Sequence, residues 1–255
     1  MAERGKPVSL VALWCSYRGA GFHGYQAQGT LRTVQAELLR AFSSVGLPRN
    51  PVVAGRTDRG VSARMQVLSS RVHTGTSLDE MRDALNAALP DDIRIERIKP
   101  AKDKFHAAWS ATGKVYRYQL GDDVSLEALE QVRAFAPSFV GTRTFKPFHF
   151  KTSEARKRTI EAVTLTGRTL EFRGDAFARH MVRMLTGALL AVARGRVSRE
   201  VFTAALEEDR FFHCPVAEPE PLTLWEVLYP ADVDPFTATE RAENAPPLPR
   251  GRGSG

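Results

Sequence analysis

A single carboxylate stands between two guanidinium groups in the stretch AGRTDRGVSARMQV, residues 54–67. Asp58 is flanked by Arg56 and Arg59, and Gly60, a residue that permits a tight turn, follows directly. Nearby arginines favour the charged form of a carboxylate, even in a pocket that excludes water. An aspartate held in this form suits a nucleophile or a general base. The alternative is a turn aspartate whose carboxylate accepts backbone N–H groups.

A second pattern, GAGFHG at residues 19–24, matches the glycine fingerprint of dinucleotide-binding folds. In those folds the glycines open a helix directly, and an acidic residue follows about 20 residues later. Here the helical period begins only at Thr33, and residues 39–46 contain no acid. We therefore set aside a nicotinamide-dependent enzyme. We expect the glycines to let the backbone approach a ligand or another chain closely.

The sequence does not indicate a metal site, a disulfide framework or a membrane-spanning segment. The six histidines lack the spacing of a zinc motif, and the two cysteines, Cys15 and Cys214, form no CxxC pair. No apolar run approaches the ~18 residues that span a bilayer, and the N-terminus lacks the apolar stretch of a secretory signal. We expect a cytoplasmic protein that needs neither a metal nor a cofactor.

The charge balance points to a polyanionic partner. The 255 residues include 36 Lys and Arg against 29 Asp and Glu, which gives a formal charge of +7. In KVYRYQL, residues 114–120, Tyr116 and Tyr118 fall on one face of a predicted strand that begins near Lys114. Such a pair could stack nucleobases, or could be an ordinary aromatic pair on a sheet surface.

A second basic segment, RGDAFARHMVRML at residues 173–185, fits the start of a long helix. On that helix Arg179 and Arg183 would lie one turn apart and could share a face. There they could bind phosphate or pair with an acid. The alternative is solvated charge on a helix surface.

Periodicity predicts the element order β-α-β-β-α-β in the first half, a ferredoxin-like order, and a similar order in the second. We predict an α+β protein with an N-terminal domain over residues 7–105, which carries the Asp58 loop, and a C-terminal domain over residues 106–230. Residues 231–255 show no periodicity, and we expect them to be disordered. The expected strands are 8–17, 51–55, 64–72, 93–98, 114–120, 159–166, 169–173 and 222–229, and the expected helices are 33–46, 77–89, 126–136, 177–193 and 198–206.

Taken together, several segments resemble the TruA family of tRNA pseudouridine synthases over roughly residues 8–230. They occur in the family's order: YRGAGFHGYQAQ, RTVQAEL, AGRTDRGVSARMQV, FHAAWSATGKVYRY, FRGDAFARHMVR and LTLWEV. The resemblance implies two ferredoxin-like halves that form one extended antiparallel sheet, with helices on one face and a central basic cleft. It also implies a homodimer that binds the anticodon arm of tRNA and isomerises uridine to pseudouridine at nucleotides 38–40, without cofactor or metal.

The resemblance assigns roles to individual residues. It implies that Asp58 is the catalytic aspartate, that Arg183 pairs with this carboxylate, and that Arg56 belongs to the catalytic loop. It implies that Tyr116 packs against the target base. We expect three further cations to bind substrate: Arg59, Arg179 and Lys114.

Some positions depart from the family pattern. Ser62 stands where the family often has His, and Met184 stands where Asn is common. The segment of residues 119–143 is shorter than the corresponding segment usually is in the family. The catalytic residues survive these changes, so we expect activity. The rival interpretations are a catalytically silent RNA-binding protein and a synthase that acts on another structured RNA.

Overall fold

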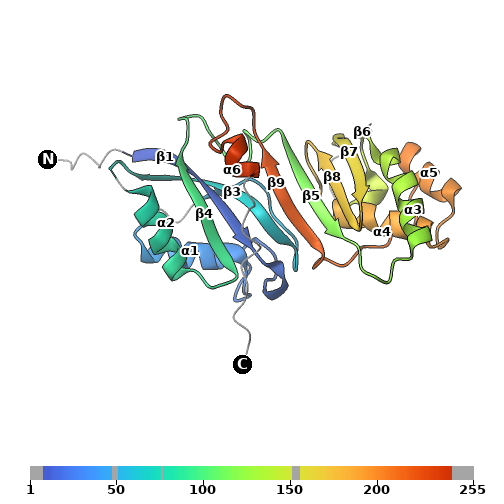
Figure 1. The fold of residues 1–255 in the computed structure, drawn as a ribbon, viewed down its shortest axis with the longest axis horizontal. Helices are drawn as coiled ribbons and strands as arrows, with labels where there is room; N and C mark the ends of the chain where they lie inside the picture. Colours follow the sequence, from blue (N-terminus) through green and yellow to red (C-terminus); the bar gives the residue numbers. More distant parts are fainter. Residues whose placement is uncertain (1–7, 48–50, 76, 151–155, 243–255) are drawn as a thin grey trace. The chain divides into compact units, whose positions relative to one another are not determined.

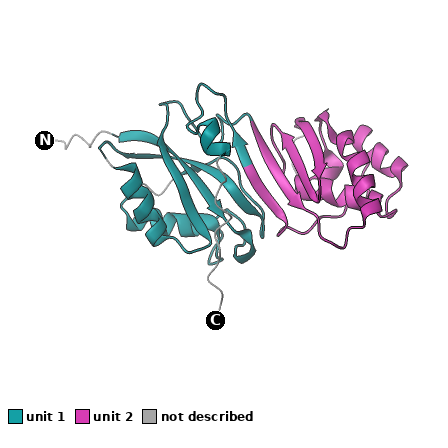
Figure 2. Ribbon diagram, viewed as in Figure 1, with its two compact units in different colours: residues 1–112, 226–255 teal, residues 113–225 magenta. Residues whose placement is uncertain are grey.

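The computed structural model describes residues 8–47, 51–75, 77–150 and 156–242 (Figure 1). The chain divides into two compact units: unit 1 comprises residues 1–112 and 226–255, and unit 2 comprises residues 113–225 (Figure 2). This differs from the predicted division at residues 105 and 106, because the chain returns to unit 1 within its last strand, β9 (Leu222–Leu228). Within the described ranges, no helix has the length and hydrophobicity of a membrane span.

Unit 1 is built on an antiparallel sheet. β1 (Val8–Tyr17) lies between β4 (Ile93–Pro100) and β3 (Ser62–His73), and the short β2 (Val52–Val53) pairs with β3 along its other edge. All four strands predicted for the first half are therefore present, with β2 shorter than expected. β1 and β3 are both buried over seven or more consecutive residues, so this sheet forms the centre of the unit.

Two helices accompany this sheet, α1 (Val34–Ser44) and α2 (Leu78–Ala88). Each begins after a hydroxyl residue, Thr33 or Ser77, whose side chain accepts a backbone N–H three residues later. The helices expected at residues 33–46 and 77–89 are therefore confirmed, and they contact each other.

Unit 2 contains a second antiparallel arrangement, in the order β5, β8, β7 and β6. Three of these strands match predicted ones: β5 (Gly113–Gln119), β7 (Arg158–Thr166) and β8 (Thr169–Gly174). The three-residue β6 (Gly141–Arg143) was not predicted, since so short a strand carries no alternation. Both units thus combine antiparallel strands with helices, which confirms the predicted α+β class.

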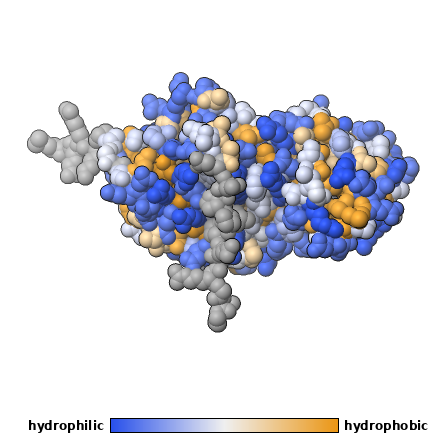
Figure 3. Space-filling view, viewed as in Figure 1, coloured by the Kyte–Doolittle hydropathy of each residue, from blue (hydrophilic) through white to orange (hydrophobic). Residues whose placement is uncertain are grey.

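The helices of unit 2 are α3 (Leu126–Phe135), α4 (Met181–Ala193) and α5 (Arg199–Glu207). Part of the core is aromatic: the ring of Phe139 makes edge-to-face contacts with those of Phe148 and Phe202, at centroid distances of 5.5 and 5.3 Å. On the face drawn in Figure 3, hydrophilic side chains cover most of both units, with small hydrophobic areas between them. Short 3-10 turns complete the structure: η1 (Gly19–Gly21), η2 (Ala136–Phe139) and η3 (Lys146–Phe148).

The start of α4 differs from the prediction, which placed it at Phe177. The helix begins at Met181, after His180 adopts a left-handed conformation with φ of 60°. Asp175 directly follows β8, and its carboxylate accepts the backbone N–H of Thr159 in β7 at 2.9 Å. The chain at Asp175 is thus tied to β7, and the left-handed backbone at His180 interrupts the helical conformation before Met181.

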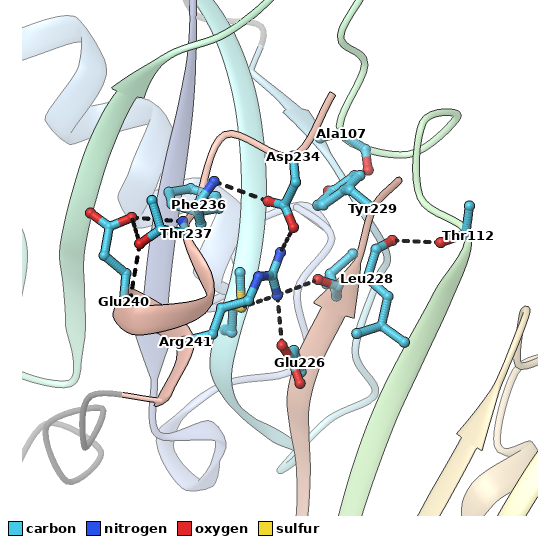
Figure 4. A network of polar contacts seen from close by, with 12 residues as sticks. Ala107, Thr112, Glu226, Leu228, Tyr229, Asp234, Phe236, Thr237, Glu240 and Arg241 are labelled. Carbon is cyan, nitrogen blue, oxygen red and sulfur yellow. Dashed lines mark hydrogen bonds and ion pairs between the residues drawn. The ribbon is translucent and has the colours of Figure 1, made fainter. Parts of the chain in front are cut away.

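The expectation of disorder after residue 230 is wrong for residues 231–242. They include a five-residue helix, α6 (Ala238–Ala242), and the buried ring of Phe236 packs edge-to-face on Trp14 at 5.7 Å. Figure 4 shows how Arg241 holds this segment, with bonds of 2.7 Å to the carboxylate of Glu226 and 2.6 Å to that of Asp234. The rest of the expected tail, residues 243–255, lies outside the described residues.

Candidate active site

Asp58 lies on the connection between β2 and β3, as the sequence predicted. The backbone N–H of Val61 donates to the carbonyl of Asp58 at 3.2 Å, which closes a tight turn, and Gly60 in that turn has a φ of 80°. A φ in this region strains residues that carry a Cβ, so glycine suits the position. Asp58 is half-buried, whereas Arg56 and Arg59 are exposed. The turn therefore presents one carboxylate between two exposed cations.

Buried polar side chains of β1 and β3 form hydrogen bonds to this loop. The hydroxyl of Tyr17 shares a hydrogen bond of 2.8 Å with the hydroxyl of Thr57, the residue before Asp58. Nε2 of Gln66 donates to the carbonyl of Gly55 at 2.7 Å and to the Tyr17 oxygen at 3.3 Å. Tyr17 and Gln66 are fully buried and Thr57 is 7% exposed, so water hardly competes with these bonds.

A second loop, which carries the GAGFHG motif, supports the Asp58 loop through backbone bonds. The N–H of Tyr25 donates to the carbonyl of Thr57 at 3.0 Å, and the N–H of Gly60 donates to the carbonyl of Phe22 at 3.3 Å. Burial raises the pKa of Tyr25, and the neighbouring Tyr17 and Cys15 act in the same direction. Tyr25 is therefore a protonated structural residue and not a proton donor to substrate.

Close approach between the two loops explains the glycines. A Cβ on Gly19 would lie 2.3 Å from the carbonyl carbon and oxygen of Val61, and one on Gly24 would lie 3.1 Å from the carbonyl oxygen of Thr57. The N–H of Gly19 also donates to the Ser62 hydroxyl at 3.0 Å. The glycines thus admit the Asp58 loop of the same chain, and not the ligand or second chain that we expected. The loop leads into α1 only at Val34, so the dinucleotide interpretation fails on geometry as well.

An ion pair holds the second loop in shape. The Arg32 guanidinium donates to both oxygens of the Asp92 carboxylate at 2.8 Å and lies 4.1 Å above the ring centre of Phe22. The hydrogen bond to Asp92 raises the pKa of Arg32, so this cation stays charged. A two-point pair of this kind fixes orientation as well as distance.

In unit 2, Tyr116 lies on β5 and is 8% exposed. Its ring contacts that of Phe177 edge-to-face at 5.2 Å between centroids. Tyr118, two residues along the same strand, is also buried. Burial raises the pKa of Tyr118, the charge of Glu218 acts in the same direction, and the charge of Arg183 opposes both. Arg183 therefore acts electrostatically on the face of β5 that carries both tyrosines.

Arg183 lies in the first turn of α4 and is half-buried. Its Nε donates to the carbonyl of Ala217 at 2.7 Å, and the N–H of Ala217 returns a bond to the carbonyl of Arg183 at 3.1 Å. One turn later a Cβ on Gly187 would lie 2.2 Å from the carbonyl oxygen of Pro215, so the chain there passes directly against the helix. This pair of contacts fixes the stem of the Arg183 side chain.

Two other predicted cations lie near this part of unit 2. Arg179 is exposed in the turn before α4 and not on the helix, so the prediction that it shares a helical face with Arg183 is wrong. Lys114 at the start of β5 is half-buried, and burial lowers its pKa while the Asp175 carboxylate opposes that shift.

Several residues that hold these side chains in place were not predicted from the sequence. Tyr17, Thr57 and Gln66 brace the Asp58 loop, and Phe177 packs on Tyr116. A tyrosine that ends a buried strand and a glutamine inside an apolar strand were available signals, because buried polar groups need partners. Across the described ranges, His, Cys, Asp and Glu side chains form no group of three or more that could hold a metal ion.

Comparison with known proteins adds the family context. A family model described as tRNA pseudouridine synthase matches residues 135–230. A tRNA pseudouridine synthase A from Geobacillus sp. is 36% identical over 237 residues, which cover 84% of this chain and 96% of that protein. Proteins of the same name from Chloroflexus aurantiacus and Bordetella parapertussis are 32% and 33% identical, over 93% and 88% of this chain and 95% and 92% of their own lengths. One solved structure, an archaeal box H/ACA ribonucleoprotein complex, aligns at 14% identity and a TM-score of 0.32 over 71% of this chain and 43% of that one.

Proposed function

The chain belongs to the tRNA pseudouridine synthase A family, and from this membership we propose that it isomerises uridine to pseudouridine in tRNA with Asp58 as its catalytic carboxylate. The enzyme class follows from the family: the protein is an isomerase of RNA. The relatives match along nearly their whole length, so the family assignment applies to both units of the chain.

The reaction defines what the site must supply. The N1–C1′ bond of the target uridine breaks, the base turns, and a C5–C1′ bond forms. C5 then loses its proton and N1 gains one, so the product is an isomer and no cofactor is consumed. A uridine inside a helical stem must first leave the stack, at a cost of a few kcal/mol. An ionised carboxylate beside the extruded nucleotide can attack the base at C6 or assist departure at C1′.

The observation that carries this proposal is the bracing of the Asp58 loop. Side chains of two strands and the backbone of a second loop hold the residues on both sides of Asp58. A turn aspartate with only a local role would need no such support. Because these bonds involve protein groups alone, the loop that carries the Asp58 carboxylate is fixed without RNA, which fits the preorganisation that catalysis requires.

We propose roles for the other site residues on the same basis. Tyr116, held edge-on by Phe177, packs against the target base, and Arg183, whose stem is fixed by Ala217, pairs with the Asp58 carboxylate. Arg56 belongs to the catalytic loop, and three cations contact RNA phosphates: Arg59, Arg179 and Lys114. At an effective dielectric constant of about 20, one guanidinium ~4 Å from a carboxylate contributes attraction of the order of 4 kcal/mol.

Finer features of the family stay predictions for this chain. They include the two ferredoxin-like halves with one extended sheet and a central basic cleft, the homodimer, the cytoplasmic location and the target nucleotides 38–40 of the anticodon arm. In unit 1 the element order and the strand order β4, β1, β3, β2 support the first of these.

The test is tritium release from [5-³H]uridine in bulk tRNA that lacks pseudouridine. Wild-type protein should release tritium, Asp58→Asn should release none above background, and Asp232→Asn, at an exposed aspartate of unit 1, should match wild type. Arg183→Ala should lose much more turnover than tRNA affinity. If wild type binds tRNA but releases nothing, the protein is a silent RNA-binding protein. If Asp58→Asn keeps its turnover, another group performs the chemistry.

A further inference from the structure

Unit 1 exposes a tryptophan, Trp109, outside the Asp58 loop. Trp109 is 86% exposed, which is unusual for so large an apolar side chain. It belongs to the loop between β4 and β5, and it is the one large apolar side chain that is exposed within residues 101–112. The indole is therefore the apolar surface that this loop exposes.

The indole is held in a defined orientation. Its ring stacks on the imidazole of His106, with 4.1 Å between centroids and 8° between planes. Nδ1 of His106 accepts the backbone N–H of Trp109 at 3.1 Å, and the main chains of His106 and Ser110 are joined by a bond of 2.9 Å. One face of the indole is thus covered by a ring that the loop itself fixes, and the other face is open.

The loop is anchored to the body of unit 1 at Ala107. The N–H of Ala107 donates to the Ser69 hydroxyl of β3 at 3.2 Å, and its carbonyl accepts the Tyr229 hydroxyl at 2.7 Å. Next to it, the ring of Phe105 packs on that of Tyr229 at 5.0 Å. Because the loop is already anchored, little further conformational entropy of the indole is lost when a partner binds.

The charge around the indole selects the type of partner. Lys102 and Lys104 are exposed in the same loop, with Asp103 as the one acid between them. Arg71 is exposed two residues beyond Ser69 on β3, and alternate residues of a strand share a face. A protein interface would surround an aromatic anchor with apolar residues and few charges. An exposed ring in a loop that also carries two exposed lysines instead fits a nucleobase flanked by phosphates.

We propose that Trp109, backed by His106, is a second RNA-binding site that stacks one unpaired nucleobase of the tRNA, away from the target uridine. This inference rests on the proposed function, since it assigns a further contact to the same substrate. Along β3, Ser62 at the Asp58 loop and Ser69 at the Trp109 loop are seven residues apart, or ~23 Å in an extended strand. That span corresponds to about seven nucleotide steps of ~3.4 Å in one strand.

Binding should be measured with full-length protein in the Asp58→Asn background, using an unmodified tRNA transcript as the probe. Trp109→Ala should raise Kd roughly 5- to 150-fold, the range for loss of one stacked base. Trp109→Phe should retain most of the affinity, because phenylalanine can still stack. Trp109→Leu should lose as much as Trp109→Ala. The control is Leu126→Ala, another exposed apolar side chain, in unit 2, and it should bind as the parent does.

A short oligonucleotide gives a second test. An RNA of about five nucleotides around the target uridine is too short for the ~23 Å span, so parent and Trp109→Ala should bind it equally. The proposal is overturned if Trp109→Ala binds the tRNA transcript like the parent, or if Trp109→Leu restores binding. It is also overturned if ultracentrifugation shows that Trp109→Ala separates subunits, since the indole would then join two copies of the chain.

These binding readouts do not depend on turnover. Loss of the Trp109 effect would therefore leave tritium release by wild-type protein in place. Conversely, absence of tritium release from wild type would reject the proposed function while the affinity difference between the Trp109 variants could still be measured.

Discussion

The hydroxyl of Thr57 offers a direct test of the view that the Asp58 loop is held in place by buried polar groups. Thr57→Val replaces this hydroxyl with a methyl group of similar size and removes the 2.8 Å bond to Tyr17. Loss of one partner from a buried hydrogen bond costs about 1–3 kcal/mol of unfolding free energy. For a chain of this size, about 2–4 °C of Tm per kcal/mol gives a fall of about 2–12 °C.

Turnover should fall as well, by a free energy similar to the loss of stability. A displacement of ~1 Å in a reacting group can cost about 100-fold in rate, so we expect kcat of Thr57→Val to fall about 10- to 100-fold. KM should change much less, because phosphate contacts supply most of the affinity for nucleic acid. Tritium release at several tRNA concentrations separates the two constants, and thermal unfolding gives the change in Tm.

Thr57→Ser is the matched control, since it keeps the hydroxyl and loses only a methyl group. It should recover most of the kcat that Thr57→Val loses. Wild-type kcat in Thr57→Val would refute the positioning role. An equal loss in Thr57→Ser would show that the methyl group, and not the hydrogen bond, supports the loop.

Two further predictions concern the second loop and the C-terminal segment. Gly19→Ala should lower kcat by at least tenfold, because its Cβ would lie 2.3 Å from the Val61 carbonyl. Gly29→Ala adds only the backbone strain of a φ of 49° and meets no atom within 4 Å, so it should keep most of the activity; equal losses in both would contradict the steric argument. Burial alone would raise the pKa of Glu240, but hydrogen bonds from Lys99 and from Thr237 outweigh it and lower that pKa below its ordinary 4.5. The resulting stability is present above pH 4.5 and is lost as the pH falls through the folded-state pKa. Lys99→Met should therefore lower Tm at pH 7, and its difference from wild type should shrink below pH 4.5; a pH-independent difference would contradict the ion pair.

Local sequence signals predicted most of the elements correctly because the interactions involved are local. The hydroxyl caps at Thr33 and Ser77, which begin α1 and α2, each bond to a backbone N–H three residues later. The location of Asp58 on a turn between two strands followed from the same signals. These features could be read without knowing what the rest of the chain does.

The errors arose where distant residues decide the structure. The start of α4 depends on the bond from the Thr159 N–H to Asp175, sixteen residues away in the sequence. The segment after residue 230 is ordered because Phe236 finds Trp14 and Arg241 finds Glu226. In each case the local pattern was correct, but a partner elsewhere in the fold determined the outcome.

Two of the departures from the family pattern, at Met184 and at Ser62, have different structural meanings. Met184 is 7% exposed on α4 and fills the interior of unit 2, so it is a packing residue. Ser62 accepts the N–H of Gly19 and so helps to join the two loops on which the geometry of Asp58 depends. A side chain that bonds to the main chain of a neighbouring loop can support a catalytic turn as part of the protein scaffold, whether or not it contacts RNA. The hydroxyl at position 62 is thus consistent with an active enzyme: the departure lies in the support of the carboxylate, while the carboxylate and both flanking arginines are present.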